Sequence, residues 1–423
     1  MTSDVVNRRF AIAFTAIIFV AAAIGIIVPA GSGWDFANFY DTGRRILGWQ
    51  IADLYDSSSL ITGSAPQGGM LFWGAPLSAL LYAPLGWLAP GAALIAFKIV
   101  GTAALFAALW ILYRHDLSFV EETDAARWRF TAMYSGAVLL FQPFWSVYRV
   151  GGQTTPLVFL LLAVAMIAHI RNRTWLTAGC LVAAVAIKPA FAIALVILGL
   201  LGGWRMLLAL GAWGVACGLV SILLLGWPVH LQFLDVVRNG LSNSYVWLYN
   251  SSLYVAAENL REYASPAVRP SFISAAVIVV KSSMLLLFAW LVWQSRTRAL
   301  LPAARRHFDF LLALTGCLAL SQTVWEHYLV LLFPLIAYVI ASYRQFSRGA
   351  VALIAAILVF SITQNVAFTV PLRPMEITSP VALVVVGLFK SAPLLLSVIF
   401  LVRYREELFT GYEAESWRRL TTA

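Results

Sequence analysis

The sequence predicts an all-α polytopic membrane protein with about 12 membrane helices. Of its 423 residues, 61% are hydrophobic and only 11% are charged, which is about half the charged fraction of a soluble domain. Apolar runs of ~20 residues, the length that crosses a hydrocarbon core, recur between residues 10 and 402. These observations exclude a soluble fold, and we interpret residues 1–423 as a single membrane domain.

The distribution of arginine predicts the topology, because basic loops of membrane proteins face the cytoplasm. We therefore expect two cytoplasmic termini, a cytoplasmic tail over residues 403–423, and a net charge of +10 that marks topology and predicts no nucleic-acid partner. The basic turns are residues 8–9, 114–129, 171–173, 205, 296–306, 344–348 and the tail. The outward loops, richer in Trp, Tyr, Asn, Asp and Ser, are 31–66, 149–153, 226–270, 325–327 and 371–379.

Ten apolar runs are interpreted as single spans. They are residues 10–29, 92–113, 130–147, 155–170, 206–225, 273–292, 308–324, 328–341, 351–368 and 381–401. Residues 70–88 carry Pro76 and Pro84 and lie between an outward loop and a span that ends inside, so we expect a juxtamembrane or re-entrant segment. Residues 176–201 carry Lys188-Pro189 at the centre, which predicts two short helices that form a hairpin.

The cysteines give no sign of a metal site or a disulfide framework. Cys180, Cys217 and Cys317 lie inside apolar stretches without the spacing of zinc ligands. We interpret them as packing residues and expect neither a metal nor a cofactor.

Charged groups at the membrane are costly, so the places where they occur are candidates for function. Residues 33–45 combine Asp35 and Tyr40 with Arg44 and Arg45 in a pattern that predicts an amphipathic helix in the first outward loop, 31–66. From residue type alone, Asp35 is equally consistent with a helix N-cap or with an ion pair to one of these arginines.

Two further outward turns carry polar groups. Arg149 and Gln153 flank a Gly-Gly pair, and Glu326 and His327 lie side by side between two apolar runs. Taken singly, the first is more simply interpreted as a plain turn and the second as a structural interfacial histidine. Three separate segments nevertheless place Asp35, Gln153 and Glu326-His327 on one membrane face, near the second large outward loop, 226–270. There a carboxylate can accept a proton from a hydroxyl, while Arg, Lys or His can hold a phosphate.

At this point the sequence resembles glycosyltransferase family 87, the polyprenol-phosphate-mannose-dependent α-mannosyltransferases of the GT-C class. The order and spacing of several short motifs along most of the chain carry the resemblance. They are Asp35-Phe36 with Tyr40 and Leu54-Tyr55; Ala75-Pro76-Leu77 with Ala83-Pro84-Leu85; Gly152-Gln153; Ala186-Ile187-Lys188-Pro189; Asn250-Ser251-Ser252-Leu253; and Trp325-Glu326-His327-Tyr328 with Leu332 and Pro334.

The resemblance implies a GT-C type fold and transfer of a hexose, mannose first, from a polyprenyl-phosphate sugar to a hydroxyl of a lipid or glycan acceptor, with inversion. Asp35 matches the general base, and His327 matches the histidine near the donor phosphate. Glu326, Gln153, Lys188 and Arg149 are the further candidates for the donor site, and Tyr40 and Asn250 are other candidate site residues. The implied location is a bacterial plasma membrane, with the active site facing the periplasm or exterior and with membrane lipids as further partners.

Two other classes fit a polytopic chain. A transporter or lipid flippase also has many broken helices, but it usually shows internal repeats and charges at mid-membrane, whereas this sequence shows no repeat and gathers its polar groups at one face. A polysaccharide polymerase or ligase generally has a large arginine-rich outward loop, and loop 226–270 offers only Arg238, Arg261 and Arg269.

Overall fold

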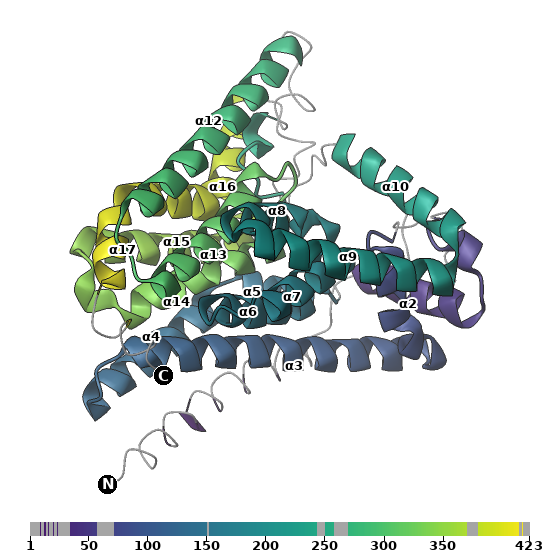
Figure 1. Ribbon diagram of the computed structural model, residues 1–423, viewed down its shortest axis with the longest axis horizontal. Coiled ribbons are helices and arrows are strands. Elements are labelled where there is room, and N and C mark those ends of the chain that lie inside the picture. The colour runs from purple at the N-terminus through teal and green to yellow at the C-terminus, as the bar shows by residue number, and fades with distance from the viewer. Residues whose placement is uncertain are drawn as a thin grey trace. The chain divides into compact units, whose positions relative to one another are not determined.

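The computed structural model describes residues 34–56, 72–149, 152–242, 250–257, 270–369 and 380–413, with the single positions 9, 12, 13, 16, 20, 23 and 417 (Figure 1). Of the described residues, 86% are helical and none forms a β-strand, which confirms the all-α prediction. Most of the predicted first span, 10–29, and outward residues 57–71 and 371–379 lie outside the described residues.

The chain folds as two compact units. Unit 1 contains residues 1–18, 112–144 and 244–423, and unit 2 contains residues 19–111 and 145–243. The interpretation of residues 1–423 as a single membrane domain stays a prediction.

Unit 2 is a set of helices in which α2 packs on η2, α6 on α7, and both α7 and α8 on α9 (Figure 1). Its elements are α2 (Trp34–Leu47), η1 (Ile51–Asp53), η2 (Pro76–Trp87), α3 (Pro90–Asp116, whose last residues belong to unit 1), α6 (Thr155–Ile170), α7 (Thr174–Ile187), η4 (Pro189–Phe191), α8 (Ala192–Leu201), α9 (Gly203–Leu225) and α10 (Trp227–Ser242). Helix α5 (Pro143–Arg149) connects the units.

Unit 1 is likewise helical, with α15 packed along α16 and with α13 in contact with both α12 and α16. Its elements are η3 (Leu117–Phe119), α4 (Asp124–Leu140), α12 (Pro270–Thr297), α13 (Pro302–Leu320), η5 (Glu326–Leu332), α14 (Phe333–Ala341), η6 (Tyr343–Gln345), α15 (Arg348–Thr369), α16 (Pro380–Arg403) and α17 (Arg405–Tyr412).

Four described helices are long and apolar enough to cross a membrane. They are α3, α9, α12 and α16, each matching a predicted span. Helix α6 does not reach this length: its 16 residues rise about 24 Å at 1.5 Å per residue, less than a hydrocarbon core of ~30 Å. The total of about 12 membrane helices stays a prediction.

Residues 70–88 and 176–201, where proline was expected to interrupt an α-helix, do not form one continuous α-helix. Residues 76–87 form a 3₁₀ helix, whose 12 residues span about 24 Å at 2.0 Å per residue, so this segment is too short to cross. Helix α7 ends at Ile187, and α8 begins at Ala192, with Lys188 in an extended conformation between them. Since both halves pack on α9, the break is confirmed, while the hairpin stays a prediction.

One predicted single span was wrong about continuity. Residues 130–147 are divided between α4 and α5, because Pro143 disfavours a helical conformation at Gln142 and has no N–H to continue the ladder. Residues 328–341 are helical without a break: η5 is a 3₁₀ helix and continues directly into α14 at Phe333, with Pro334 in the first turn of the α-helical part.

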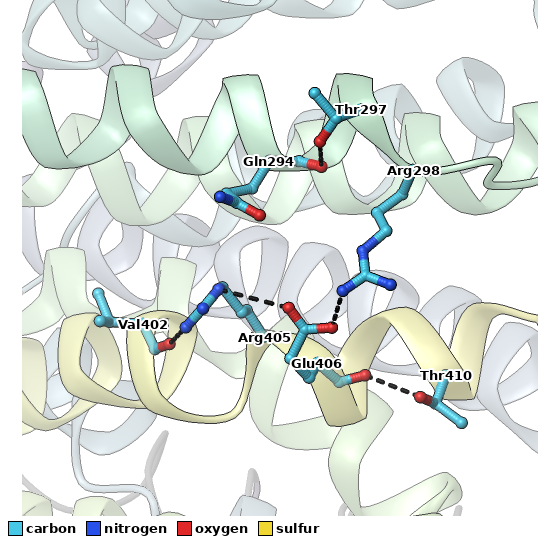
Figure 2. Close-up of polar contacts among 7 residues, drawn as sticks. All are labelled: Gln294, Thr297, Arg298, Val402, Arg405, Glu406 and Thr410. Carbon is cyan, nitrogen blue, oxygen red and sulfur yellow. Dashed lines mark hydrogen bonds and ion pairs between the residues drawn. The ribbon is translucent and has the colours of Figure 1, made fainter.

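The basic turns of unit 1 contact one another. Arg298, just after α12, pairs with Glu406 of α17, and the Arg405 guanidinium lies 3.7 Å from the same carboxylate (Figure 2). Arg344 pairs with Glu121 in the same way. These pairs are exposed, so each contributes little stability. Together with the hydrogen bonds from the N–H and the hydroxyl of Ser347 to Glu407, they bring four turns that the topology assigns to the cytoplasm to one end of the unit.

Helix α2 lies against η2 at two glycines. A Cβ atom on Gly43 would meet the Tyr82 carbonyl oxygen at 2.1 Å, and one on Gly86 would meet the backbone of Gly43 at 2.9 Å. Around this contact, the Phe39 and Tyr82 rings stack with centroids 4.9 Å apart. The absence of side chains at both positions therefore fixes how α2, which carries Asp35, sits on the unit.

We expect Gly43→Ala to lower the stability of the protein by about 1–3 kcal/mol, because the methyl group must push two backbones apart. Thermal unfolding of the purified protein in detergent measures the effect. Gly211→Ala in α9, where a Cβ atom meets nothing within 4 Å, is the matched control and should leave the melting temperature unchanged or raise it. Equal melting temperatures for Gly43→Ala and the native protein would contradict the close approach.

Candidate active site

Helix α2 presents Asp35 in its first turn, next to the positive end of the helix dipole. The helix is held by aromatic side chains: Phe36 packs on Phe97 with ring centroids 5.8 Å apart, and the hydroxyl of Tyr40 donates to the Leu88 carbonyl at 2.9 Å. Asp35 itself is only partly buried. The carboxylate is thus placed by a rigid surrounding but remains within reach of a substrate.

Gln153 reaches Asp35 because of the glycine that precedes it. Gly152 has a φ of +98°, and a Cβ atom there would lie 3.1 Å from Phe97 and 3.3 Å from Phe36. A non-glycine residue would be strained in this conformation, and its Cβ atom would crowd the Phe97 ring and the Cβ atom of Phe36. The chain therefore passes close to α2 at this point and then enters α6 at Thr155.

Lys188 is placed by the proline that follows it. Pro189 removes the residue before it from the α region, so Lys188 has φ −142° and ψ 89°, and α7 ends. The break exposes carbonyls at the end of α7, and the Ala186 carbonyl accepts a 2.8 Å hydrogen bond from the backbone N–H of Ala75, just before η2. The same break thus positions the lysine and ties α7 to η2.

These three segments meet in one hydrogen-bonded network. The Gln153 amide nitrogen donates to Oδ2 of Asp35, and its amide oxygen accepts from the Lys188 ammonium at 2.9 Å. The ammonium also donates to the Thr155 hydroxyl at 3.0 Å. A primary amide has both a donor and an acceptor, so Gln153 connects an anion to a cation without joining them directly.

The electrostatics of Asp35 suit a proton acceptor. Burial raises the pKa of its carboxyl to about 6, against the opposing effects of the Lys188 charge and the Gln153 hydrogen bond. At neutral pH the group is therefore mainly ionised, yet it is more basic than an ordinary aspartate. Within the described residues, Oδ2 is the Asp35 oxygen that takes part in a hydrogen bond, which leaves Oδ1 for a substrate hydroxyl.

The sequence indicated Asp35, Gln153 and Lys188 separately, and the structure brings them together. The charge that acts on Asp35 is that of Lys188, while Arg44 donates to the Gly86 carbonyl and Arg45 to the Leu54 carbonyl. Thr155 was not anticipated, and only its place beside Gln153 could have indicated it.

Two other candidates from unit 2 are placed differently. The Tyr40 side chain is only 5% exposed and lies in the aromatic core, where its hydroxyl bonds to backbone. Arg149 is the last residue of α5, and its side chain lies outside the described residues.

In unit 1, Asn250 connects its own segment to the turn that leads to Glu326 and His327. The Asn250 carboxamide oxygen accepts from the backbone N–H groups of Val324 at 2.9 Å and Ser252 at 3.0 Å. Asn250 and Trp325 also form an isolated antiparallel bridge, next to a 2.6 Å bond from Ser251 N–H to the Val324 carbonyl. Asn250 is fully buried, so it holds the turn in place.

Glu326 and His327 begin η5 and are 3% and 5% exposed. The imidazole contacts the Tyr328 ring edge to face, with centroids 4.9 Å apart. They belong to unit 1 and Asp35 belongs to unit 2, so a shared role of these residues stays a prediction. Among the described residues, no three His, Cys, Asp or Glu side chains gather in a metal-binding arrangement.

Long apolar helices and a buried polar network define an integral membrane protein with a candidate active site. The model of glycosyltransferase family 87 matches residues 72–321, more than half of the chain, so the chain belongs to this family and is a membrane glycosyltransferase. The match includes Gln153, Lys188 and Asn250, starts after Asp35 and ends before Glu326. No curated protein and no solved structure matches the chain. Membership of this family favours a glycosyltransferase function over the alternative of a transporter or flippase.

We expect Asn250→Ala to destabilise the protein by about 2–4 kcal/mol, because it leaves two buried backbone N–H groups without their acceptor. Thermal unfolding in detergent measures the loss. Gln345→Ala, at an exposed amide of the same unit, serves as the control and should unfold like the native protein. An Asn250→Ala protein as stable as that control would show that the carboxamide does not hold the turn.

Proposed function

We propose that the protein transfers a hexose, in the first place mannose, from a polyprenyl-phosphate sugar to a hydroxyl group of a lipid or glycan acceptor. The reaction takes place at the non-cytoplasmic face of a bacterial plasma membrane, on a GT-C type fold, with inversion at the anomeric carbon. The observation that carries this proposal is the network of Asp35, Gln153 and Lys188 in a chain of glycosyltransferase family 87.

Asp35 acts as the general base. Its carboxylate takes the proton of the acceptor hydroxyl, the oxygen attacks the anomeric carbon, and the bond from that carbon to the phosphate oxygen breaks. Polyprenyl phosphate leaves with the electron pair. Because this leaving group is already activated, positioning and charge stabilisation contribute most of the remaining acceleration.

Gln153 and Lys188 adjust the pKa of the general base, Asp35. A direct ion pair with a lysine would lower the pKa of the carboxyl and weaken its basicity. Here the amide of Gln153 separates the two charges, so the lysine is stabilised while the carboxyl keeps a pKa of about 6. Gln153 also fixes Oδ2, which orients the other oxygen towards the acceptor.

His327 and Glu326, with Arg149, are proposed to act on the donor phosphate and sugar. The support is their place in outward turns: the basic turns of unit 1 gather at one end, through Arg298–Glu406 and Arg344–Glu121, and residues 325–327 lie between α13 and α14, whose other ends carry the basic turns. This arrangement supports an outward position for the histidine and cytoplasmic termini.

We expect Asp35→Asn to insert and fold normally while the rate of sugar transfer falls about 10²–10⁴-fold, the usual contribution of a general base. The measurement is transfer by purified protein from a panel of polyprenyl-phosphate sugars to membrane lipids, with products identified by mass spectrometry. Asp53→Asn, at an exposed carboxylate of the same outward loop, is the control and should transfer normally. Full activity of Asp35→Asn would remove Asp35 from the mechanism.

The rate of sugar transfer should also fall at low pH, because Asp35 becomes protonated. Its carboxyl must be ionised to act, so kcat/KM should be constant above pH 7 and fall about tenfold per unit below pH 6. In Lys188→Met the cation that lowers this pKa is absent. The acid limb of the pH profile, where kcat/KM falls with falling pH, should therefore move to higher pH.

Arg44→Met tests whether any nearby cation has the same effect. Arg44 lies on the same helix, is exposed, and does not act on the Asp35 carboxyl. Its acid limb should coincide with that of the native protein. An unmoved acid limb in Lys188→Met would show that the lysine charge does not reach the base.

A further inference from the structure

The four lysines of the chain are distributed differently from its 25 arginines. In the four helices that can cross a membrane, each arginine lies in the first or last turn, for example Arg296 in α12 and Arg403 in α16. Lys98 of α3, Lys281 of α12 and Lys390 of α16 lie at least two turns from either end of their helices. The fourth lysine is Lys188, at the break between α7 and α8. A lysine at the centre of a span costs ~2.5–3.5 kcal/mol, so an intramembrane lysine indicates a function.

Lys281 has no role in the proposed chemistry so far, and its surroundings are well defined. Its ammonium donates to the Gln322 amide oxygen at 3.3 Å and lies 5.1 Å from the centre of the Tyr254 ring. Both partners are neutral. Among the described residues no carboxylate pairs with Lys281, so its positive charge is not compensated there.

The predicted topology places this ammonium in the outward half of the membrane. Side chains of a helix lean towards its N-terminus, and the N-terminal end of α12, at Pro270, follows the outward loop 226–270. Gln322 lies in the turn after α13 that continues to Trp325, so the hydrogen bond brings the ammonium to the level of this turn. Lysine can reach the interface in this way while its stem stays in the apolar layer.

The site is also open to lipid. Lys281 is only partly buried, and the neighbouring side chains Ile278, Leu285 and Leu286 of α12 are 63%, 59% and 70% exposed. An apolar helix face with this exposure in a membrane protein contacts lipid tails. A lipid head group at the outward interface can therefore approach the ammonium from the bilayer.

We infer that Lys281 binds the phosphate of a lipid, the polyprenyl monophosphate released by, or bearing the sugar for, the proposed transfer. The inference rests on the proposed function for the identity of the lipid, and on the structure for the phosphate. A lysine ammonium has three donors; one is held by Gln322, and a phosphate oxygen is the strong, charge-assisted acceptor that the site otherwise lacks. Tyr254 and Gln322 then serve as positioning residues for this cation.

The test uses the full-length protein, purified in detergent, and a matched pair of ligands. Polyprenyl monophosphate and the corresponding polyprenol differ only in the phosphate, and phosphatidylglycerol supplies a phosphate on a different lipid. Native mass spectrometry measures the bound fraction of each over a concentration series. We expect the native protein to bind the polyprenyl monophosphate at least about tenfold more tightly than polyprenol, as one charge-assisted hydrogen bond to a phosphate provides.

The variants separate a phosphate-binding lysine from a structural one. Lys281→Gln should lose the preference for the phosphate, and Lys281→Arg should retain most of it. Gln322→Leu removes the hydrogen bond that positions the ammonium but keeps the charge, so it should weaken the preference without abolishing it. If Lys281→Gln binds both ligands like the native protein, or if Gln322→Leu loses the preference as fully as Lys281→Gln, the inference is wrong.

The two lipids identify the source of the phosphate. Loss of polyprenyl monophosphate binding alone in Lys281→Gln indicates the donor lipid, whereas an equal loss of phosphatidylglycerol binding indicates a general lipid-phosphate site. Because the assay measures binding, it is independent of turnover: a native protein that binds the phosphate through Lys281 but transfers no sugar would refute the proposed function and leave this inference standing. Sugar transfer by the native protein, together with unchanged phosphate binding in Lys281→Gln, would support the proposed function and refute this inference.

Discussion

The break in the helix at Pro189 is the constraint on which the candidate active site depends. If α7 continued, Lys188 would project from the side of a regular apolar helix, and the Ala186 carbonyl would be used within that helix. Because proline cannot continue the ladder, Lys188 is extended and reaches Gln153, and the freed carbonyl accepts from Ala75 before η2. The same local rule thus positions the cation and attaches the platform on which α2, with Asp35, is packed.

The features that could be predicted from the sequence are those set by residues close together in the chain. The long apolar runs predicted α3, α9, α12 and α16, and the Lys188-Pro189 pair predicted the interruption, because length, hydropathy and proline chemistry act within a few residues. The division of residues 130–147 follows from the same chemistry at Pro143, but hydropathy alone does not register a backbone break. An apolar run therefore predicts that a segment is buried or in lipid better than it predicts that the segment is one helix.

The partners of Asp35 could not be predicted in the same way. An ion pair to Arg44 or Arg45 was one alternative, yet nine residues of helix rise about 13.5 Å, which is beyond the reach of these side chains. The actual partner, Gln153, is 118 residues away in the sequence. Only the packing of Gly152 against Phe36 and Phe97 brings it to α2. The Asn250–Val324 contact in unit 1 could not be predicted either, because it joins residues that are 74 positions apart in the sequence.

Both lysines whose surroundings are described in detail are held by a glutamine amide oxygen: Lys188 by Gln153 at 2.9 Å and Lys281 by Gln322 at 3.3 Å. A carboxylate in place of either amide would satisfy the ammonium more strongly, but it would also cancel its field. An amide accepts the hydrogen bond and leaves the positive charge in place. In unit 2 that charge lowers the pKa of Asp35 only from a distance, and burial still keeps the carboxyl more basic than an ordinary aspartate. In unit 1 it remains for an anion that arrives from the membrane. Arginine, with five donors in a rigid fork, would need more acceptors than one amide offers, so a single glutamine suits a lysine better than an arginine at these two positions.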